Sequence, residues 1–155
     1  MPPPSIYKKD RGAQYGTLFH DAMAVLSLDK PEKTGNDRLD KDIANCVDAL
    51  RPLLPKGQVF RETAFLQSIE KDSVPIIIQG VVDMMIVGEK EIILIDYKTN
   101  TRSLKGDEIT MESLAELYDG QLAMYADAIM KAGKKPVRKY IYSTHLNALR
   151  EILNY

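Results

Sequence analysis

The first part of the chain carries apolar residues at helical spacing. An apolar side chain recurs every three or four positions over about 13–27, which predicts an amphipathic helix. The members of this stripe are Phe19, Ala22, Met23 and Leu26. A polar loop is expected over 27–37, and a second helix follows it and ends before Pro52. The stripe of this second helix consists of Leu39, Ile43, Cys46, Val47 and Leu50.

The hydrophobic period changes beyond Pro55. Three segments rich in Val, Ile, Phe and Tyr are separated by short turns, and they predict strands at 59–69, 76–87 and 91–99. The third segment is continuously apolar from Ile92 onward and then ends in the polar letters "DYKT". A buried strand that ends in charged residues indicates a site at that end.

The remainder of the chain predicts a long helix and a last strand. The helix is expected over about 111–132, closed by Gly133, with lysines near its C-terminal end as the helix dipole favours. A strand is expected at 137–144, and 145–155 is interpreted as a short helix or a truncated end. The order of these elements predicts a mixed α/β or α+β domain.

Composition and charge narrow the function classes. With 155 residues, 45% apolar and 28% charged, the chain is expected to form one domain over 13–155, preceded by a polar tail or linker at 1–12. The net charge of −1 argues against a strong polyanion binder. No Walker A pattern occurs in the sequence, so this chain alone is not expected to be an ATP-driven motor.

Cysteine content and hydropathy predict an intracellular protein. Cys46 is the single cysteine, which excludes internal disulfides and a four-cysteine iron–sulfur cluster. No apolar run approaches the roughly 20 residues of a membrane span. The opening Met-Pro-Pro-Pro does not have the basic-then-apolar pattern of a signal peptide. We therefore expect a cytoplasmic location without membrane contact.

The stretch "QGVVDMMIVGEKEIILIDYKT" predicts a β-hairpin with its turn near Gly88. With an even loop centred there, Asp83 faces Leu94, and Asp96 projects from the same side of the sheet two residues further on. The two aspartates become diagonal neighbours, about 7–8 Å apart at the backbone, and Lys98 shares their face. A three-residue loop would reverse the parity and remove this pairing.

Two carboxylates beside a lysine suit a divalent cation at a phosphodiester. Mg²⁺ takes oxygen ligands, and a lysine could position or deprotonate a water or neutralise developing charge. Tyr97 projects to the opposite face, where packing is expected, although its carbonyl could add an oxygen ligand. The alternative is a solvated Asp–Lys pair at a strand end. Burial of so apolar a strand favours the metal site.

These residues resemble the motifs of the PD-(D/E)xK nuclease superfamily, through "GVVD", the thirteen-residue step from Asp83 to Asp96, and "DYKT". More narrowly, the chain resembles the RecB-type nuclease domain of bacterial helicase–nucleases of the RecB and AddA kind. Three further motifs carry this narrower resemblance, and the set covers about 16–142 in the family's order. They are "GTLFH" ending at His20, "ETAF" beginning at Glu62, and "YDGQLAMYADAI" beginning at Tyr118.

The resemblance implies a restriction-endonuclease-like core, a central mixed sheet flanked by helices, that cleaves DNA with Mg²⁺. Mn²⁺ is an alternative because imidazole is a less usual ligand of Mg²⁺. The implied metal ligands are His20, Asp83, Asp96 and the carbonyl of Tyr97. The implied catalytic residues are Asp83, Asp96, Lys98, Gln121 and Tyr125. No iron–sulfur cluster is expected.

Several motif residues keep a second interpretation. Tyr118 is expected to belong to a half-buried aromatic seam of its helix. The amide of Gln121 in that stripe needs a partner, which could be a water, a phosphate or Lys98. Glu62 is as consistent with a structural ion pair as with a role in the site. The basic residues that could contact phosphates, or form solvated ends, are Arg102, Lys105, Lys134, Lys135, Arg138 and Lys139.

The function that the resemblance implies is a metal-dependent deoxyribonuclease, exonuclease or endonuclease. It would be the nuclease domain of a helicase–nuclease in double-strand-break repair and recombination, in a bacterial cytoplasm. A helicase in cis or in a complex would supply single-stranded DNA. The alternatives are a non-catalytic nuclease-like module that binds DNA or protein, and a standalone phage or repair nuclease. The intact set Asp83, Asp96 and Lys98 favours the enzyme.

Overall fold

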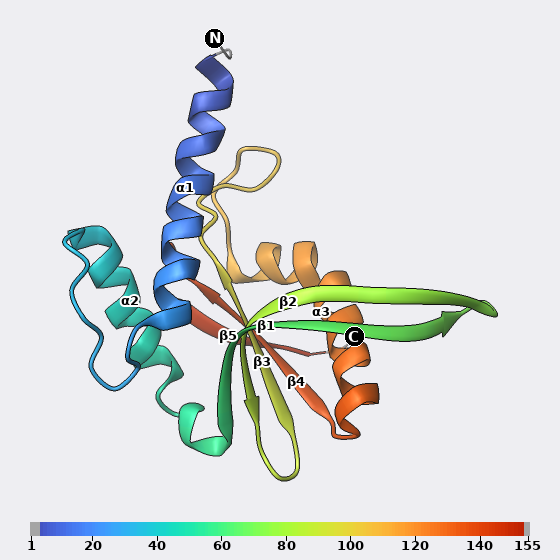
Figure 1. Cartoon of the computed structure of the whole chain (residues 1–155). Helices are drawn as coiled ribbons and strands as arrows, with labels where there is room; N and C mark the ends of the chain where they lie inside the picture. Colours follow the sequence, from blue (N-terminus) through green and yellow to red (C-terminus); the bar gives the residue numbers. More distant parts are fainter. Residues whose placement is uncertain (1–3, 154–155) are drawn as a thin grey trace.

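The computed structural model describes residues 4–153 and forms a central sheet with helices on both faces (Figure 1). Along the described residues the elements are α1 (Pro4–Val25), α2 (Asp37–Leu50), the 3-10 turn η1 (Leu54–Lys56), β1 (Gln58–Lys71), β2 (Val74–Val87), β3 (Ile92–Lys98), α3 (Met111–Gly133), β4 (Val137–Ser143) and β5 (Ala148–Ile152). No helix among the described residues is both long and apolar enough to span a membrane.

The sheet is mixed, and its strand order follows the chain from β1 to β5. Neighbouring strands pair antiparallel except β3 and β4, which run parallel because α3 crosses over between them. β1 and β2 are twice as long as β3 and project beyond the rest of the sheet as a two-stranded arm (Figure 1). This arrangement confirms the expected mixed α/β core.

Alternating side chains of β3 divide the core into two halves. Ile93, Ile95 and Tyr97 pack toward α1 and α2, whereas Ile92 and Leu94 pack toward α3. The stripes predicted for the first two helices enter the first half, and the expected packing of the Tyr97 side chain there is confirmed. The stripe residues that are buried are Phe19, Met23, Leu39, Ile43, Cys46, Val47 and Leu50.

The register of the β2–β3 hairpin differs by two residues from the predicted one. Val87 pairs with Ile92 across a four-residue turn, in which the Gly88 N–H donates to the carbonyl of Glu91 at 2.9 Å. Leu94 therefore pairs with Met85 and not with Asp83. An even shift preserves the parity, and it brings Asp83 and Asp96 to directly opposed positions, one step beyond the Met84–Ile95 pair.

Two element boundaries also differ from the prediction. α1 begins at Pro4 and not near residue 13, because Pro4 suits a first helical turn and residues 5–11 contain no helix breaker. The role of the first twelve residues as a tail or linker stays a prediction. Lys134, in the left-handed conformation with φ of 56°, caps α3 one residue beyond Gly133.

The end of the described chain is a strand, so the short helix expected over 145–155 is wrong, whereas the alternative of a truncated end stays a prediction. Asn147 adopts a φ of 46° and accepts a hydrogen bond from the Tyr142 hydroxyl at 2.9 Å, which turns the chain back along β4. In β5, Leu149 then packs on the α1 side and Ile152 on the α3 side. That alternation is typical of a strand covered on both faces.

Candidate active site

Two carboxylates meet at the end of β3. Asp83 and Asp96 are within hydrogen-bonding reach of each other, and their side chains are 18% and 25% exposed. The backbone N–H of Tyr97 donates to Asp83 Oδ2 at 2.8 Å. Burial, followed by the adjacent charge of Asp96, raises the pKa of Asp83 to about 8. Two partly buried carboxylates side by side require a cation or a shared proton.

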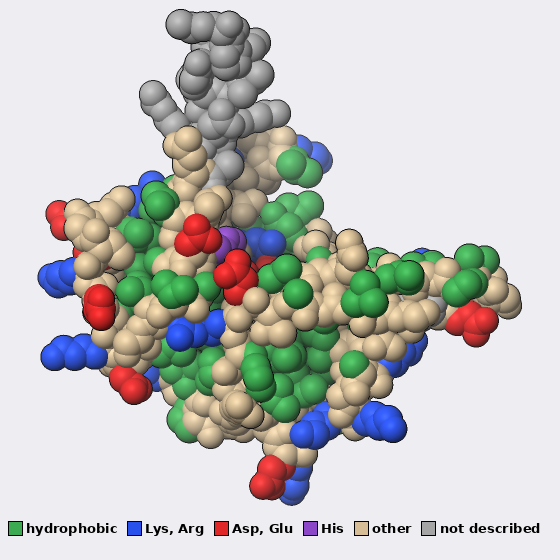
Figure 2. All heavy atoms as spheres, viewed as in Figure 1, with side chains coloured by type: hydrophobic (Ala, Val, Ile, Leu, Met, Phe, Trp, Pro, Cys, Tyr) green, Lys and Arg blue, Asp and Glu red, His purple; other side chains and the backbone are tan. Residues whose placement is uncertain are grey.

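His20 reaches this pair from α1. Its Nε2 lies 3.1 Å from the carbonyl oxygen of Tyr97 and 3.4 Å from Asp83 Oδ2. Its ring stacks on the Tyr97 ring with 5.9 Å between the centroids. Burial lowers the pKa of His20, which favours the neutral imidazole that metal ions bind. Figure 2 shows purple, red and blue side chains gathered beside α1, near the base of the arm.

Gly16 explains how α1 comes so close to the end of β3. A Cβ atom at this position would lie 2.9 Å from Thr99 Oγ1, closer than side chains normally approach. A glycine one turn before His20 therefore lets the helix backbone approach the strand end. The Gly-x-x-x-His spacing in the sequence thus has a physical reason in this structure.

Lys98 extends beside Asp96 on the α3 side of the sheet. Its Nζ lies 2.9 Å from Asp96 Oδ2, and its side chain is 16% exposed. Asp96 Oδ2 is itself buried and has no hydrogen-bond partner. Its contact with the ammonium is therefore an ion pair and not a hydrogen bond. The ammonium also lies 3.7 Å from the centroid of the Tyr118 ring. Lys98 is therefore held between a carboxylate and an aromatic face.

The donor set fits a divalent cation chemically. Carboxylate oxygens and a carbonyl oxygen are the ligands that hard cations prefer, and the buried Asp96 Oδ2, which has an ion pair with Lys98 but no hydrogen bond, is an acceptor for such a cation. Within residues 4–153, however, no three side chains of His, Cys, Asp or Glu are gathered closely enough to form a metal-holding group. The structure thus places Asp83 against both His20 and Asp96 without bringing all three to one point.

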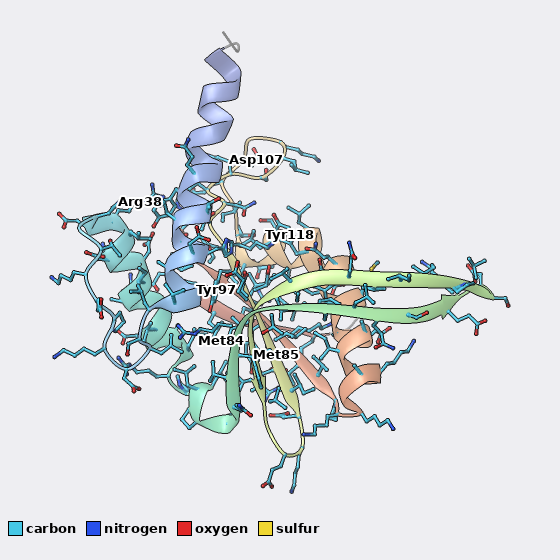
Figure 3. All side chains as sticks on the ribbon, viewed as in Figure 1. Arg38, Met84, Met85, Tyr97, Asp107 and Tyr118 are labelled. Atoms are coloured by element: carbon cyan, nitrogen blue, oxygen red, sulfur yellow. The ribbon has the colours of Figure 1, made fainter. Side chains whose placement is uncertain are left out.

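Gln121 and Tyr125 lie further along α3, where Tyr125 packs against the arm. Gln121 Nε2 donates to the Tyr125 hydroxyl at 3.4 Å, and the Tyr125 ring packs edge-on against Phe65 at 5.0 Å. Their described contacts are with each other and with the arm, so their part in catalysis stays a prediction. The α3 residue that contacts Lys98 is Tyr118, which begins the "YDGQLAMYADAI" motif but was expected to belong to an aromatic seam of its helix. Figure 3 shows Tyr118 projecting from α3 toward the end of the sheet.

Position 80 is expected to require glycine, because the Tyr125 ring occupies the space that a side chain would need. A Cβ atom at position 80 would lie 2.7 Å from the ring and hydroxyl of Tyr125, which Phe65 holds in place. We expect Gly80→Ala to lower the free energy of unfolding by about 1–3 kcal/mol through overpacking. Denaturant unfolding measures it. In a Tyr125→Ala background the loss should vanish, and an equal loss in both backgrounds would contradict this explanation.

Glu62 marks the bend at which the arm leaves the sheet. It has a φ of 44°, and the ladder of β1 and β2 skips it between the Arg61–Met84 and Thr63–Val82 pairs. Its charge acts on His20, so it lies near the same cluster. Arg61, next to it, donates to the carbonyls of Met23 and Leu26 and so caps the end of α1. A glutamate in this rare conformation gives no sequence signal beyond its motif.

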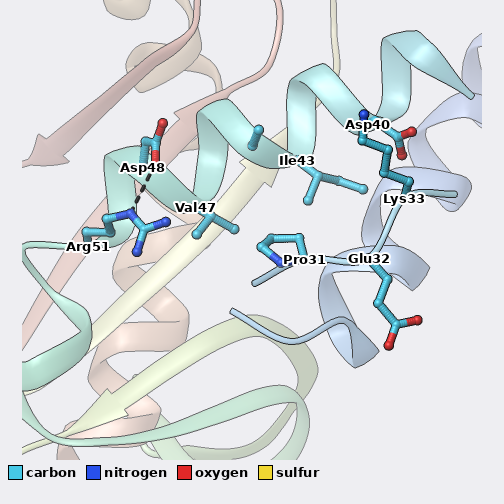
Figure 4. Close-up of a pocket in the computed structure, with 9 residues that line it drawn as sticks. Pro31, Glu32, Lys33, Asp40, Ile43, Val47, Asp48 and Arg51 are labelled. Carbon is cyan, nitrogen blue, oxygen red and sulfur yellow. Dashed lines mark hydrogen bonds and ion pairs between the residues drawn. The ribbon is translucent and has the colours of Figure 1, made fainter. Parts of the chain in front are cut away.

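A pocket lies between α2 and the loop that precedes it, away from the cluster of His20, Asp83 and Asp96 (Figure 4). Three of its charged groups are already paired, since Asp48 binds Arg51 at 3.1 Å and Asp40 accepts hydrogen bonds from Thr34. No buried unpartnered atom found among the described side chains belongs to this pocket. It therefore offers no comparable chemistry.

Comparisons with known proteins agree with this geometry. The model of the PD-(D/E)XK nuclease superfamily matches residues 3–151. An ATP-dependent helicase/nuclease protein from Pediococcus pentosaceus is 29% identical over 93% of this chain and 14% of its own length. The protein of the same name from Listeria monocytogenes is 31% identical over 90% of this chain and 14% of its own length.

Among solved structures, the chain is similar to a protein from Eubacterium rectale that is described as an exonuclease. The two are 11% identical with a TM-score of 0.46, and the match covers 97% of this chain and 57% of that chain. This chain spans about one seventh of the length of the two helicase/nuclease relatives, as their 14% coverage states.

Proposed function

The chain belongs to the PD-(D/E)XK nuclease superfamily, and we propose that its site hydrolyses phosphodiester bonds of DNA with a divalent cation. The observation that carries the proposal is the convergence of Asp83, Asp96 and Lys98 at the end of β3. Adjacent antiparallel strands supply the two carboxylates, and the lysine lies 2.9 Å from Asp96. A scaffold that only bound DNA would gain nothing from burying two carboxylates together.

Each residue has a definite task in this proposal. Asp83 and Asp96 would hold the cation, which supplies Lewis-acid stabilisation of charge on the phosphodiester when it is bound. His20 and the Tyr97 carbonyl, 3.1 Å apart, lie beside Asp83 as further donors. Lys98 would orient the attacking water or neutralise the charge that develops on the phosphate oxygens.

The donor types support Mg²⁺ as the cation, with Mn²⁺ as an alternative. Oxygen donors dominate the site, and Mg²⁺ usually binds one or two protein carboxylates and keeps several waters. The imidazole of His20 is a donor that Mn²⁺ tolerates better than Mg²⁺ does. Activity with both ions, and more with Mn²⁺ at low concentration, is the expected pattern.

We further propose that a helicase delivers a single strand to this domain. The relatives carry both activities in their names, and a net charge of −1 gives this chain little long-range attraction for DNA. In this proposal, residues 1–12 link the nuclease, residues 13–155, to a preceding helicase domain. Tight and salt-sensitive binding of single-stranded DNA by this chain alone would contradict the need for delivery.

The test is cleavage of end-labelled single-stranded DNA by this chain with Mg²⁺ or Mn²⁺. Lys98→Ala is expected to lower the cleavage rate by about a hundredfold or more, the usual contribution of a positioned proton-transfer group. Binding of Mn²⁺, measured by calorimetry, should persist because both carboxylates remain. Lys90→Ala, an exposed lysine in the turn after β2, is the matched control and should cleave like the wild type. Equal rates in all three proteins would show a contaminating nuclease.

A further inference from the structure

Lys98 is held by an aromatic residue that lies outside its own "DYKT" motif. The ammonium lies 3.7 Å from the centroid of the Tyr118 ring, on the side of Lys98 that faces α3. Asp96 Oδ2 lies 2.9 Å from the same nitrogen. A cation is attracted to the face of a tyrosine ring through the ring quadrupole, most strongly where water is excluded. With 16% of its side chain exposed, Lys98 lies in such an environment.

Tyr118 itself is fixed at both ends. The Asn100 side chain donates from Nδ2 to the Tyr118 hydroxyl at 3.1 Å. The body of the ring packs against the buried cluster beneath α3, whose members include Ile109, Leu114, Leu122 and Ile141. The ring is therefore a rigid wall beside a side chain that otherwise has four rotatable bonds. Removing this wall would leave the ammonium with its ion pair to Asp96.

We propose that Tyr118 is a positioning residue that holds the ammonium of Lys98 in the site by the face of its ring. This inference rests on the proposed function only for its effect on cleavage. Its structural part, the cation on the ring, is independent of whether the domain cuts DNA. The ring, and not the hydroxyl, is the part that acts on Lys98, so phenylalanine should replace tyrosine and leucine should not.

The first measurement does not use activity. Lysines are dimethylated with ¹³C-formaldehyde, which keeps their charge, and the methyl signals are recorded by NMR in the absence of metal and DNA. The Lys98 signal is identified by its loss in Lys98→Arg. It is expected upfield of the other lysine signals because of the ring current, to remain there in Tyr118→Phe, and to join the others in Tyr118→Leu. Tyr125→Leu, the same change further along α3, should leave it in place.

The second measurement separates kcat from KM for DNA cleavage. Tyr118→Leu is expected to lower kcat by about tenfold to a hundredfold, as loss of an orienting partner usually does, with KM unchanged. Tyr118→Phe should restore kcat to within about twofold. A Lys98 signal that stays upfield in Tyr118→Leu overturns the inference, and so does an unchanged kcat in a wild type that cleaves. If the wild type does not cleave, the proposed function fails and the NMR result alone decides this inference.

Discussion

Asp96→Asn is expected to lower the rate of DNA cleavage by about a thousandfold or more. Asp96 supplies a buried carboxylate oxygen without a hydrogen-bond partner and lies 2.9 Å from Lys98 Nζ. An amide has the same shape but no charge, so it weakens the hold on a cation and removes the counter-charge of the lysine. Metal stabilisation of a transition state amounts to several kcal/mol, and each 1.36 kcal/mol is a factor of ten.

Initial rates on labelled single-stranded DNA with Mg²⁺ or Mn²⁺ measure this loss. The matched control is Asp72→Asn, the same change at the exposed tip of the arm, where a φ of 52° suits asparagine. The control should cleave at the wild-type rate. Unchanged unfolding temperature in both variants would show that the loss is chemical. Cleavage by Asp96→Asn within tenfold of the wild type would place the catalytic centre elsewhere.

The sequence predicted the pairing of Asp83 with Asp96 because that pairing depends on parity alone. Any turn with an even number of residues keeps the two side chains on one face of the sheet. An error of two residues in the register therefore still leaves them neighbours. Helix faces were predictable for a similar reason. Each buried residue of α2 lies on the stripe that 3.6 residues per turn defines. These features depend only on local periodicity.

The contact of Lys98 with Tyr118 was not predictable in this way. It depends on how far α3 is rotated about its own axis above the sheet, and packing beneath the helix sets that rotation. The motif drew attention to Gln121, which contacts Tyr125 and not the lysine. The bend at Glu62 is equally hidden, because only the surrounding structure holds a glutamate at a φ of 44°. Long-range packing decides both features.

Asp83→Asn is expected to lower the rate of DNA cleavage to a similar extent as Asp96→Asn. It is also expected to raise the stability of the metal-free protein. Burial first, and then Asp96, raises the pKa of Asp83 to about 8 from an ordinary value of 3.8. A group whose pKa rises on folding stabilises the fold fully below its unfolded pKa, and this stabilisation is lost as the pH rises through the folded pKa. Asparagine does not ionise, and its side-chain oxygen can still accept the Tyr97 N–H.

The stability of the metal-free wild type should therefore fall, relative to that of Asp83→Asn, as the pH rises from about 4 to 8. The difference in stability between the two proteins should be largest near pH 8. The groups that face Asp83, namely His20, Asp96 and Lys98, are the same in both proteins. Thermal unfolding in the presence of a chelator measures the difference, at about 2–4 °C for each kcal/mol in a domain of this size. Parallel curves over this pH range would contradict a buried, proton-sharing carboxylate pair.

Adding the cation should reverse the order of stability. A ligand at one hundred times its Kd stabilises the protein that binds it by about 2.7 kcal/mol, and a weaker binder gains less. Excess Mn²⁺ at pH 8 is therefore expected to raise the unfolding temperature of the wild type above that of Asp83→Asn. A metal-dependent reversal together with lost cleavage would show that the carboxylate pair costs stability in the empty site and exists to hold the ion.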